Sequence, residues 1–488
     1  MQQPKSQVPA YDILLGEQLE LIHQKTLHIL QEGGIAFLYE PAVAILRAHG
    51  VDVDDDGVAR FSPDIIESYL AKTPSQFTWS APNPQNDVDI GGNHVCFAPV
   101  VGPPFVVDSE RGRRESTHQD LINFLKLTQS SPYLHCSGSE IVVSSDLPIA
   151  SRHLELFYSH FEYSDKAMMG VYHTGLTGED SLAMARIFHG EDAMANKHFL
   201  HCIVNVSSPR RLDDRMLSLL IAYAKANQIV NITPFILSGA MGPTSILGTV
   251  AQLNAETLAG IVFTQMVRAG TPCIYGSFQS VVDLQSGAPV LGAPESQLAL
   301  YISGQLARRY GIPFRAAGHY ASSKIIDAQG AYESALSMGP SLLSAPNFVL
   351  HAAGWLESGL AAGYEKFVLD SELLGMYHTF FKGINWDEDE WAMESILHEV
   401  PPGGHHLGTA HTMRHFRDAF YRAELFDYDA AETWAAKGAE DAVQRANRKY
   451  KQMIADYQKP PVDEGRLAAL RGYIEERKQH LTPAMIVG

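Results

Sequence analysis

The stretch from Pro313 to Glu333 opens with the apolar run Pro313-Phe314-Arg315-Ala316-Ala317 and continues through Gly318-His319-Tyr320 into a polar loop. A carboxylate, Asp327, then stands where a helix would begin. In α/β proteins, a short apolar strand that ends in glycine and polar residues before a helix is typical of the mouth of an active site. Seven other places in the chain follow the same plan, so this stretch predicts a repeated strand–helix fold.

Eight short apolar runs alternate with amphipathic segments between Leu134 and Leu374. In the segments between them, apolar residues recur at i, i+3 and i+4, as in Leu298, Tyr301 and Ile302. This count predicts an α/β protein built on a (β/α)8 TIM barrel; a doubly wound open sheet, which shows the same alternation, is the alternative. The runs are Leu134–Val143, Ala167–Tyr172, Phe199–Val206, Ile232–Leu237, Cys273–Phe278, Pro313–Ala317, Phe348–Ala352 and Lys366–Leu369.

The flanks of the predicted barrel differ from it in pattern. Residues 1–130 are expected to form a helical N-terminal region with a β-hairpin, whose strands we place at Val95–Val101 and Phe105–Val107. Residues 131–385 are expected to form the barrel. Residues 386–488 are expected to form a helical C-terminal extension that packs on the barrel.

The composition narrows the class of protein. Hydrophobic residues make up 45% of the chain and charged residues 19%, as in ordinary globular proteins. The net charge of −18 argues against a nucleic-acid partner and against binding to anionic lipid. No run of about 18 apolar residues occurs, so we expect no membrane-spanning segment.

Four cysteines in 488 residues, without a Cys-x-x-Cys pair, indicate a reducing compartment and no disulfide framework. The N-terminal segment has no apolar stretch of the kind that an export signal needs. Together these features predict a cytoplasmic protein.

Residues at the strand ends are the candidates for substrate binding, because catalysis in such barrels takes place at the C-terminal ends of the strands. They are rich in aromatic and acidic side chains. Aromatic faces near a carboxylate attract a cation such as quaternary ammonium, by ~1–2 kcal/mol per desolvated contact. For any single aromatic, plain barrel packing is the alternative. The candidates are Tyr172, His173, Tyr275, Phe278, Phe348, His351 and Trp355.

Three further residues are candidates for catalysis: Glu333, Gln329 and His319. Asp327 suits the N-cap of the next helix, and Gln329 and Glu333 then share a face of that helix at i, i+4 spacing. The functional interpretation has this face closing the barrel mouth. The alternative is a capped helix that faces solvent.

Histidines after residue 400 raise the question of a metal. His405, His406, His411 and His415 have a spacing that zinc could use, but no thiolate lies nearby. We therefore expect no metal site, and an alternative is that the loop around His405 and His406 folds over the barrel mouth.

Several motifs together resemble the trimethylamine methyltransferase superfamily, in particular its branch without pyrrolysine, which includes glycine betaine–corrinoid methyltransferases. The resemblance covers nearly the whole chain. The motifs that carry it are Gly239-Ala240-Met241-Gly242-Pro243-Thr244, Gly248-Thr249, Asn254-Ala255-Glu256, Gln265, Gly292-Ala293-Pro294-Glu295 and Asp327-Ala328-Gln329 with Glu333.

The resemblance implies an enzyme that moves a methyl group from an amine to the cob(I)alamin of a separate corrinoid protein, which docks at the barrel mouth. This chain would then bind no cofactor tightly itself. The family's pyrrolysine aligns near Ser322-Ser323-Lys324, where this chain has ordinary residues. That difference favours a quaternary amine, such as glycine betaine or a related betaine, over trimethylamine.

Two other functions compete with this hypothesis. One is a metal-dependent TIM-barrel lyase or hydrolase, and the other is a non-catalytic barrel that binds a betaine. The identity of the methylated amine and the oligomeric state stay open, with a homo-oligomer as one outcome.

Overall fold

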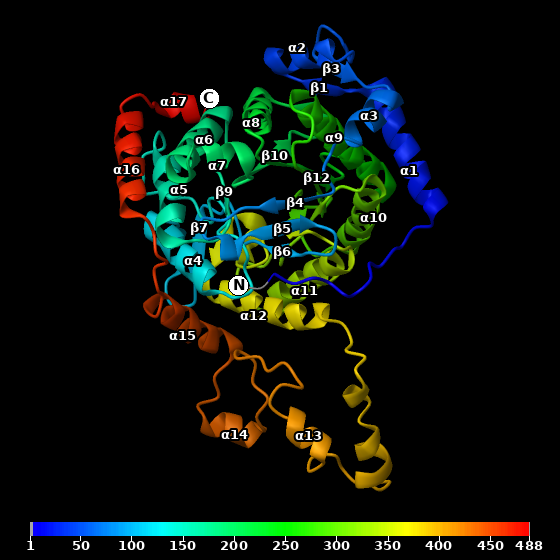
Figure 1. Ribbon diagram of the computed structural model, residues 1–488, viewed down its shortest axis with the longest axis vertical. Helices are drawn as coiled ribbons and strands as arrows, with labels where there is room; N and C mark the ends of the chain where they lie inside the picture. The colour runs from blue at the N-terminus through cyan, green and yellow to red at the C-terminus, as the bar shows by residue number, and fades with distance from the viewer. Residues whose placement is uncertain (1–2, 488) are drawn as a thin grey trace.

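The computed structural model describes residues 3–487. Eight parallel segments form its centre, and Figure 1 shows helices around them. One segment is the extended stretch 135–137. The other seven are the strands β6 (Cys96–Phe97), β9 (Met168–Met169), β10 (Leu200–Val206), β12 (Ile229–Ser238), β13 (Cys273–Gly276), β16 (Phe314–Ala316) and β17 (Phe348–Val349).

Pairing between the first and last strands closes this sheet into a barrel. From β9 to β17 each strand pairs in parallel with the next, and β17 pairs with β6, with Phe348 opposite Cys96. On the other side of β6, the backbone N–H of His135 donates to the carbonyl of Phe97 at 2.9 Å. Cys136 in turn bridges Ala167 in parallel, just before β9. The (β/α)8 barrel is therefore confirmed, and the open sheet is excluded.

One helix follows each of the eight segments and covers the outside of the barrel (Figure 1). Local sequence signals set their ends. Gly311 ends α10 in the left-handed conformation and leads into β16, and Asp327 caps α11 through the N–H of Gly330, as predicted. The helices are α4 (His118–Ser130), α5 (Arg152–Tyr163), α6 (Gly175–His189), α8 (Asp214–Lys225), α9 (Ile246–Val267), α10 (Pro294–Tyr310), α11 (Ala328–Leu343) and α12 (Tyr364–Phe381).

Two strand assignments from the sequence are wrong. Lys366–Leu369, taken as the eighth strand, lies inside α12, where Lys366 pairs with Asp370 one turn later. A short apolar run fits a buried helix as well as a buried strand. The missing strand is β6, which lies within the Val95–Val101 segment assigned to the hairpin. The predicted division at residues 130 and 385 stays a prediction, although β6 comes from the first of those regions.

A hairpin of the N-terminal region closes one end of the barrel. The hairpin of β4 (Gln76–Trp79) and β5 (Val88–Gly91) lies at the N-terminal ends of the strands, where Ser80 donates to His198 just before β10. The indole of Trp79 packs against Phe348 and His201 inside the barrel. This end is therefore closed by side chains, and the other end is left for a site.

The remaining N-terminal and inserted elements form three small units. The helices α1 (Gly16–His28), α2 (Glu40–Ala48) and α3 (Pro63–Leu70) contact α9. The strands β1 (Ile35–Phe37), β2 (Asp52–Val53) and β3 (Val58–Arg60) form a sheet with β11 (Arg211–Leu212). A second sheet joins the hairpin of β7 (Phe105–Asp108) and β8 (Gly112–Glu115) to β18 (Trp355–Leu356) and β19 (Ala361–Gly363). Other short elements are α7 (Glu191–Asn196), β14 (Phe278–Val282) and β15 (Pro289–Val290).

Within residues 3–487, α9 alone is long and apolar enough to cross a membrane by composition. Its most apolar window is 83% buried inside the protein. It packs against α1, α3 and β12, which makes it a core helix of the fold.

The C-terminal part divides into packed helices and a projecting segment (Figure 1). The helices α15 (Ala442–Ala455) and α16 (Glu464–Lys478) pack on the barrel helices α12 and α6, and α17 (Pro483–Val487) also contacts α6. Residues 382–420, which we name the arm, extend away from the barrel and include the short turns Glu388–Trp391 and Ser395–Glu399 and the helix α13 (Ala410–His415). The helix α14 (Ala431–Ala436) follows the arm in the chain.

Candidate active site at the open end of the barrel

A cavity of about 480 Å³ lies where the strands end, and every segment of the barrel wall contributes to its lining. The loop between β18 and β19 covers part of it through residues 358–360. The lining residues are Val101, Gly102, Glu140, Tyr172, His173, Ile203, Asn205, Val206, Thr233, Phe235, Met241, Phe278, Arg315, Leu350, His351, Trp355, Ser358, Gly359 and Leu360.

The guanidinium of Arg315 is the central charge of this cavity. Because side chains alternate along β16, Phe314 packs in the core under the helices while Arg315 turns inward. Arg315 is 1% exposed and donates to the carbonyl of Ser277 at 2.8 Å and to the hydroxyl of Tyr320 at 3.3 Å. Among residues 3–487, its Nε has no hydrogen-bond partner, and no carboxylate lies within ion-pair distance of it. A buried cation without a counter-ion is costly, so the geometry suits an anionic ligand group.

Two imidazoles near Arg315 do not share its charge. Burial, and then the charge of Arg315, lowers the pKa of His201 to about 3. The same two causes hold the pKa of His351 well below its ordinary value. His351 accepts a hydrogen bond from the N–H of Val101 at 3.2 Å and has a left-handed backbone, with φ of 59°. At neutral pH both rings are therefore neutral.

Aromatic side chains form one wall of the cavity. The ring of Phe278 stacks on Tyr320 with centroids 4.8 Å apart and meets Phe235 at 4.6 Å. Trp355 lies 4.8 Å from Tyr320 and 4.5 Å from His351. The guanidinium of Arg315 lies 5.3 Å from the Phe278 ring centre, so the aromatic wall begins beside the cation.

An acid–base pair lies at the rim. Glu140, on the loop after segment 135–137, is buried, and one carboxylate oxygen lies 3.1 Å from Nε2 of His173, whose side chain is 41% exposed. Burial lowers the pKa of His173, but the hydrogen bond and charge of Glu140 outweigh it and raise the pKa above its ordinary value. Burial, and then the charge of Glu140, raises the pKa of Tyr172, so its phenol stays neutral. The rim thus presents a carboxylate next to an aromatic ring.

The predicted substrate-binding residues separate into two groups. Tyr172, His173, Phe278, His351 and Trp355 line the cavity together. Tyr275 and Phe348 do not: the Tyr275 hydroxyl donates to Asn254 on α9 at 2.9 Å, outside the barrel wall, and Phe348 lies deep in the interior beside Trp79.

The three predicted catalytic residues lie outside the lining. Gln329 donates to Glu333 at 2.9 Å on one face of α11, and Glu333 accepts from the N–H groups of Ser322 and Ser323 at 2.6 and 3.1 Å. This pair therefore holds the loop before α11. His319 is fully buried, donates to the carbonyl of Ala352 at 2.6 Å and faces Asp370 on α12.

One charged residue of the cavity, Arg315, was missed as a candidate. Arg315 stands between Phe314 and Ala316 in a short apolar strand, and an arginine in such a position is itself a signal, because a buried charge needs a partner. Glu140 belongs to the strand-end residues of the first predicted run, Leu134–Val143, although it is not one of the candidates named for substrate binding.

One group of possible metal ligands occurs among the described residues: Asp389, His411 and His415. It lies on the arm, where Asp389 also pairs with Arg414 at 2.6 Å. His405 and His406 are likewise on the arm and do not line the cavity. None of these residues is therefore placed for metal chemistry at the barrel mouth.

A closed (β/α)8 barrel with a charged and aromatic cavity at the C-terminal ends of its strands is the architecture of a TIM-barrel enzyme. The particular family follows from comparison with known proteins. The chain belongs to the trimethylamine methyltransferase (MTTB) family, whose model matches residues 1–482.

Several relatives are similar over nearly their full length. The glycine betaine methyltransferase of Desulfitobacterium hafniense (strain Y51) is 40% identical over 471 residues, which are 96% of this chain and 98% of that protein. The proline betaine:corrinoid methyltransferase of Eubacterium limosum is 26% identical, over 94% of this chain and 96% of that protein. The trimethylamine methyltransferase of Methanosarcina thermophila is also 26% identical, over 93% and 94%.

A solved structure supports the fold. The monomethylamine methyltransferase of Methanosarcina barkeri superposes with a TM-score of 0.53 at 9% identity, covering 93% of this chain and 90% of that one.

Proposed function

We propose that this protein transfers a methyl group from a betaine, such as glycine betaine, to cob(I)alamin carried by a separate corrinoid protein. The observation that carries the proposal is the buried guanidinium of Arg315, which has no counter-ion among the described residues and whose Nε has no hydrogen-bond partner, beside the aromatic wall of the cavity. A betaine has one carboxylate and one quaternary ammonium, so it offers the charge that Arg315 needs and the cation that aromatic rings attract.

The cavity suits one orientation of such a zwitterion. The carboxylate would bind Arg315, which is buried, and the ammonium would lie toward the rim, near Trp355, Tyr172 and the carboxylate of Glu140. A methyl group then faces the open end of the barrel, where a partner protein can approach. This order matters because methyl transfer requires the donor carbon and the acceptor to be aligned.

The chemistry requires little from the side chains. The Co(I) centre of the partner supplies the electron pair, which forms the new bond to the methyl carbon. The C–N bond breaks, and its electrons remain on the nitrogen of a neutral tertiary amine, so no proton is transferred. Among the lining residues there is no cysteine or lysine to form a covalent intermediate. The residues therefore bind, orient and desolvate the donor.

The family relatives support the same assignment. One of them is named as a glycine betaine methyltransferase and another as a proline betaine:corrinoid methyltransferase. We infer that the corrinoid protein docks over the cavity, that this chain binds no cofactor tightly, and that the reaction takes place in the cytoplasm.

The test is methylation of free cob(I)alamin, or of a corrinoid protein, by the purified enzyme, followed by the visible absorption spectrum of the cobalt centre. We expect turnover with glycine betaine or a related betaine and none with trimethylamine. Tight betaine binding without turnover, with every corrinoid offered, would favour the non-catalytic barrel. Activity that depends on stoichiometric zinc or manganese would favour the metal-dependent alternative.

A further inference from the structure

The arm carries many large apolar side chains and exposes them to solvent. Residues 382–420 hold ten of the 26 exposed large hydrophobic side chains among the described residues, including Trp386 at 72%, Leu407 at 77% and Phe420 at 90% exposure. Only Ser395 and Thr409 are buried in this range. Soluble monomers rarely leave so much apolar surface in one place, so the arm is expected to be covered by another surface.

The arm is tied to the barrel only at its two ends. Within the described chain, every recorded hydrogen bond and ion pair of residues 384–420 has both partners inside that range; for example, Asn385 donates to Glu390, and Arg414 pairs with Asp389. At its ends, Gly383 bonds back to Phe380, and Tyr421 bonds to Glu372 on α12. The arm therefore has local order without a hydrophobic core.

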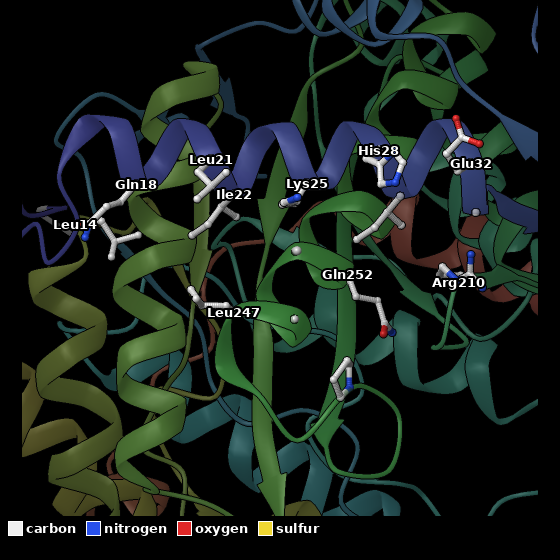
Figure 2. Close-up of a pocket in the computed structure, with 15 residues that line it drawn as sticks. Leu14, Gln18, Leu21, Ile22, Lys25, His28, Glu32, Arg210, Leu247 and Gln252 are labelled. Atoms are coloured by element: carbon white, nitrogen blue, oxygen red, sulfur yellow. The ribbon is translucent and has the colours of Figure 1, made fainter.

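A second apolar surface on the same chain has no partner either. A groove of about 820 Å³ lies between α1 and the start of α9, and Figure 2 shows Leu21 and Ile22 of α1 facing Leu247 of α9. Leu21 is 58% exposed and Leu247 is 59% exposed. Lys25 and Arg210 give the groove basic groups, whereas the arm carries the acidic run Asp387-Glu388-Asp389-Glu390.

We propose that two copies of this chain associate by arm exchange, with the arm of each copy packed in the α1–α9 groove of the other. Both surfaces are apolar, and their net charges are of opposite sign. In the groove Lys25 and Arg210 outnumber Glu32, and on the arm seven carboxylates outnumber Lys382, Arg414 and Arg417. Figure 1 shows the arm at one end of the longest axis and α1 on the flank of the barrel in the other half of the molecule, so two copies aligned antiparallel place each arm beside the half of the other copy that holds the groove. Such a reciprocal contact has closed two-fold symmetry.

The available area is sufficient for a stable dimer. Ten large apolar side chains, several of them aromatic, present on the order of 1,000 Å² per copy, which exceeds the roughly 800 Å² per partner of a standard interface. The arm begins after α12, at the barrel end that the β4–β5 hairpin closes, as the bond from Gln7 to Phe381 and the contact of residue 6 with Asn93 indicate. A corrinoid protein must instead reach the open end, so it is not the partner that we assign to the arm.

Analytical ultracentrifugation of the full-length protein tests the exchange. We expect the wild type to sediment as a dimer of the 53.6 kDa chain at micromolar concentration. An arm variant, Trp386→Ser with Phe420→Ser, and a groove variant, Leu21→Glu with Leu247→Glu, should each be monomeric. Circular dichroism spectra like that of the wild type would show that both variants are folded.

Mixing the two variants gives the sharper result. The groove variant keeps an intact arm and the arm variant keeps an intact groove, so the mixture can form one of the two contacts, and we expect mixed dimers that neither variant forms alone. Cysteines introduced at Leu407 in one copy and Leu21 in the other should crosslink in the same mixture. A monomeric wild type, a dimer that survives either pair of substitutions, or a mixture that stays monomeric would overturn the proposal.

Discussion

The barrel mouth and the arm differ in what they bury and in what they expose to solvent. The mouth buries charge: Arg315 is 1% exposed and Glu140 4% exposed, in a wall of aromatic rings. The arm exposes apolar surface: Phe420 is 90% exposed and Leu407 77% exposed. Each region lacks something within the chain, a counter-ion in the first case and a cover in the second. The difference is the basis of both proposals, a betaine carboxylate bound by Arg315 at the mouth and a protein surface that covers the arm.

The same contrast appears in two aspartate–arginine pairs. Asp120 on α4 meets Arg114 through two bonds of 2.6 and 2.7 Å and is 3% exposed. Asp389 on the arm meets Arg414 at 2.6 Å with both side chains more than half exposed. The distances are alike, so the two pairs differ in environment rather than in geometry. Mutations at these positions measure what the environment contributes.

The largest effect is expected at Arg315. Replacing it with Gln removes the cation that we assign to the betaine carboxylate and leaves that carboxylate buried without a partner. The cost of breaking such a pair is about 3–5 kcal/mol, so kcat/KM with glycine betaine should fall by roughly 10²-fold to several 10³-fold. Steady-state methylation of cob(I)alamin measures it.

The control for Arg315 is a ligand that has no carboxylate. Tetramethylammonium should inhibit the wild type and the Arg315→Gln variant about equally, because its binding uses only the cation-binding wall. Arg315→Lys should recover part of the activity, since it keeps the charge but loses the planar fork. Equal losses for glycine betaine and tetramethylammonium would instead indicate a collapsed cavity, and the carboxylate assignment would then fail.

The buried pair gives the next largest effect. Burial raises the pKa of Asp120, but hydrogen bonds from Arg114, Thr117 and Tyr364 outweigh it and lower the pKa to about 2. Because the folded pKa lies below the unfolded value of about 3.9, the stabilisation is present above about pH 4 and is lost as the pH falls toward 2. Asp120→Asn should cost about 2 kcal/mol at pH 7.

Thermal unfolding measured from pH 7 to pH 3 checks this linkage. For a chain of this size, about 2 kcal/mol corresponds to a shift of about 2 °C in the unfolding midpoint. The gap between the Asp120→Asn variant and the wild type should narrow below pH 4, because the Asp120 carboxyl of the unfolded wild type becomes protonated there while the folded one stays ionised. A gap that stays constant over this range would mean that the charge of Asp120 contributes nothing.

The strands that the sequence predicted well are those with several consecutive apolar residues. Phe199–Val206 and Pro313–Ala317 contain β10 and β16. The assignment failed for β6, which has two residues and lies in a region full of turns, and for Lys366–Leu369, whose apolar residues face the core from a helix. For β6 the deciding information is its pairing partner β17, which lies far away in the sequence. Lys366–Leu369 belongs to the helix that begins at Tyr364, directly after β19, and a short apolar run alone does not show this.

Prediction of the candidate site from the sequence succeeded and failed for similar reasons. The strand-end rule found Phe278, His351 and Trp355, because proximity to a strand end was enough to place them at the mouth. It failed for Tyr275, since a residue at a strand end points inward or outward according to the register of its strand. Arg315 was passed over because it lies within its strand rather than after it, and only the closed barrel shows that its side chain faces the interior.

The aromatic wall gives a smaller, more local effect. Phe278→Leu keeps the bulk of the side chain but removes the ring, and we expect binding of glycine betaine to weaken by about 1 kcal/mol, or roughly five-fold. Phe348→Leu is the matched control, because this ring lies deep in the interior and does not line the cavity. Isothermal titration should show weaker binding only for the first variant. Equal weakening in both would contradict the binding of glycine betaine beside the aromatic wall that contains Phe278.

The exposed pair on the arm should show the smallest effect. Asp389 bonds to His415 at 2.7 Å and to Arg414 at 2.6 Å, and these bonds lower its pKa below the ordinary value. Because the carboxylate lies in solvent, water and salt screen the attraction, and exposed pairs of this kind often contribute nothing measurable. Because the proposed dimer would cover this pair, the measurement uses the groove variant Leu21→Glu with Leu247→Glu, in which the arm lies in solvent. In that variant, Asp389→Asn should leave the unfolding midpoint unchanged at 0.15 M salt. A loss as large as that of Asp120→Asn would mean that the pair contributes more than an exposed pair can.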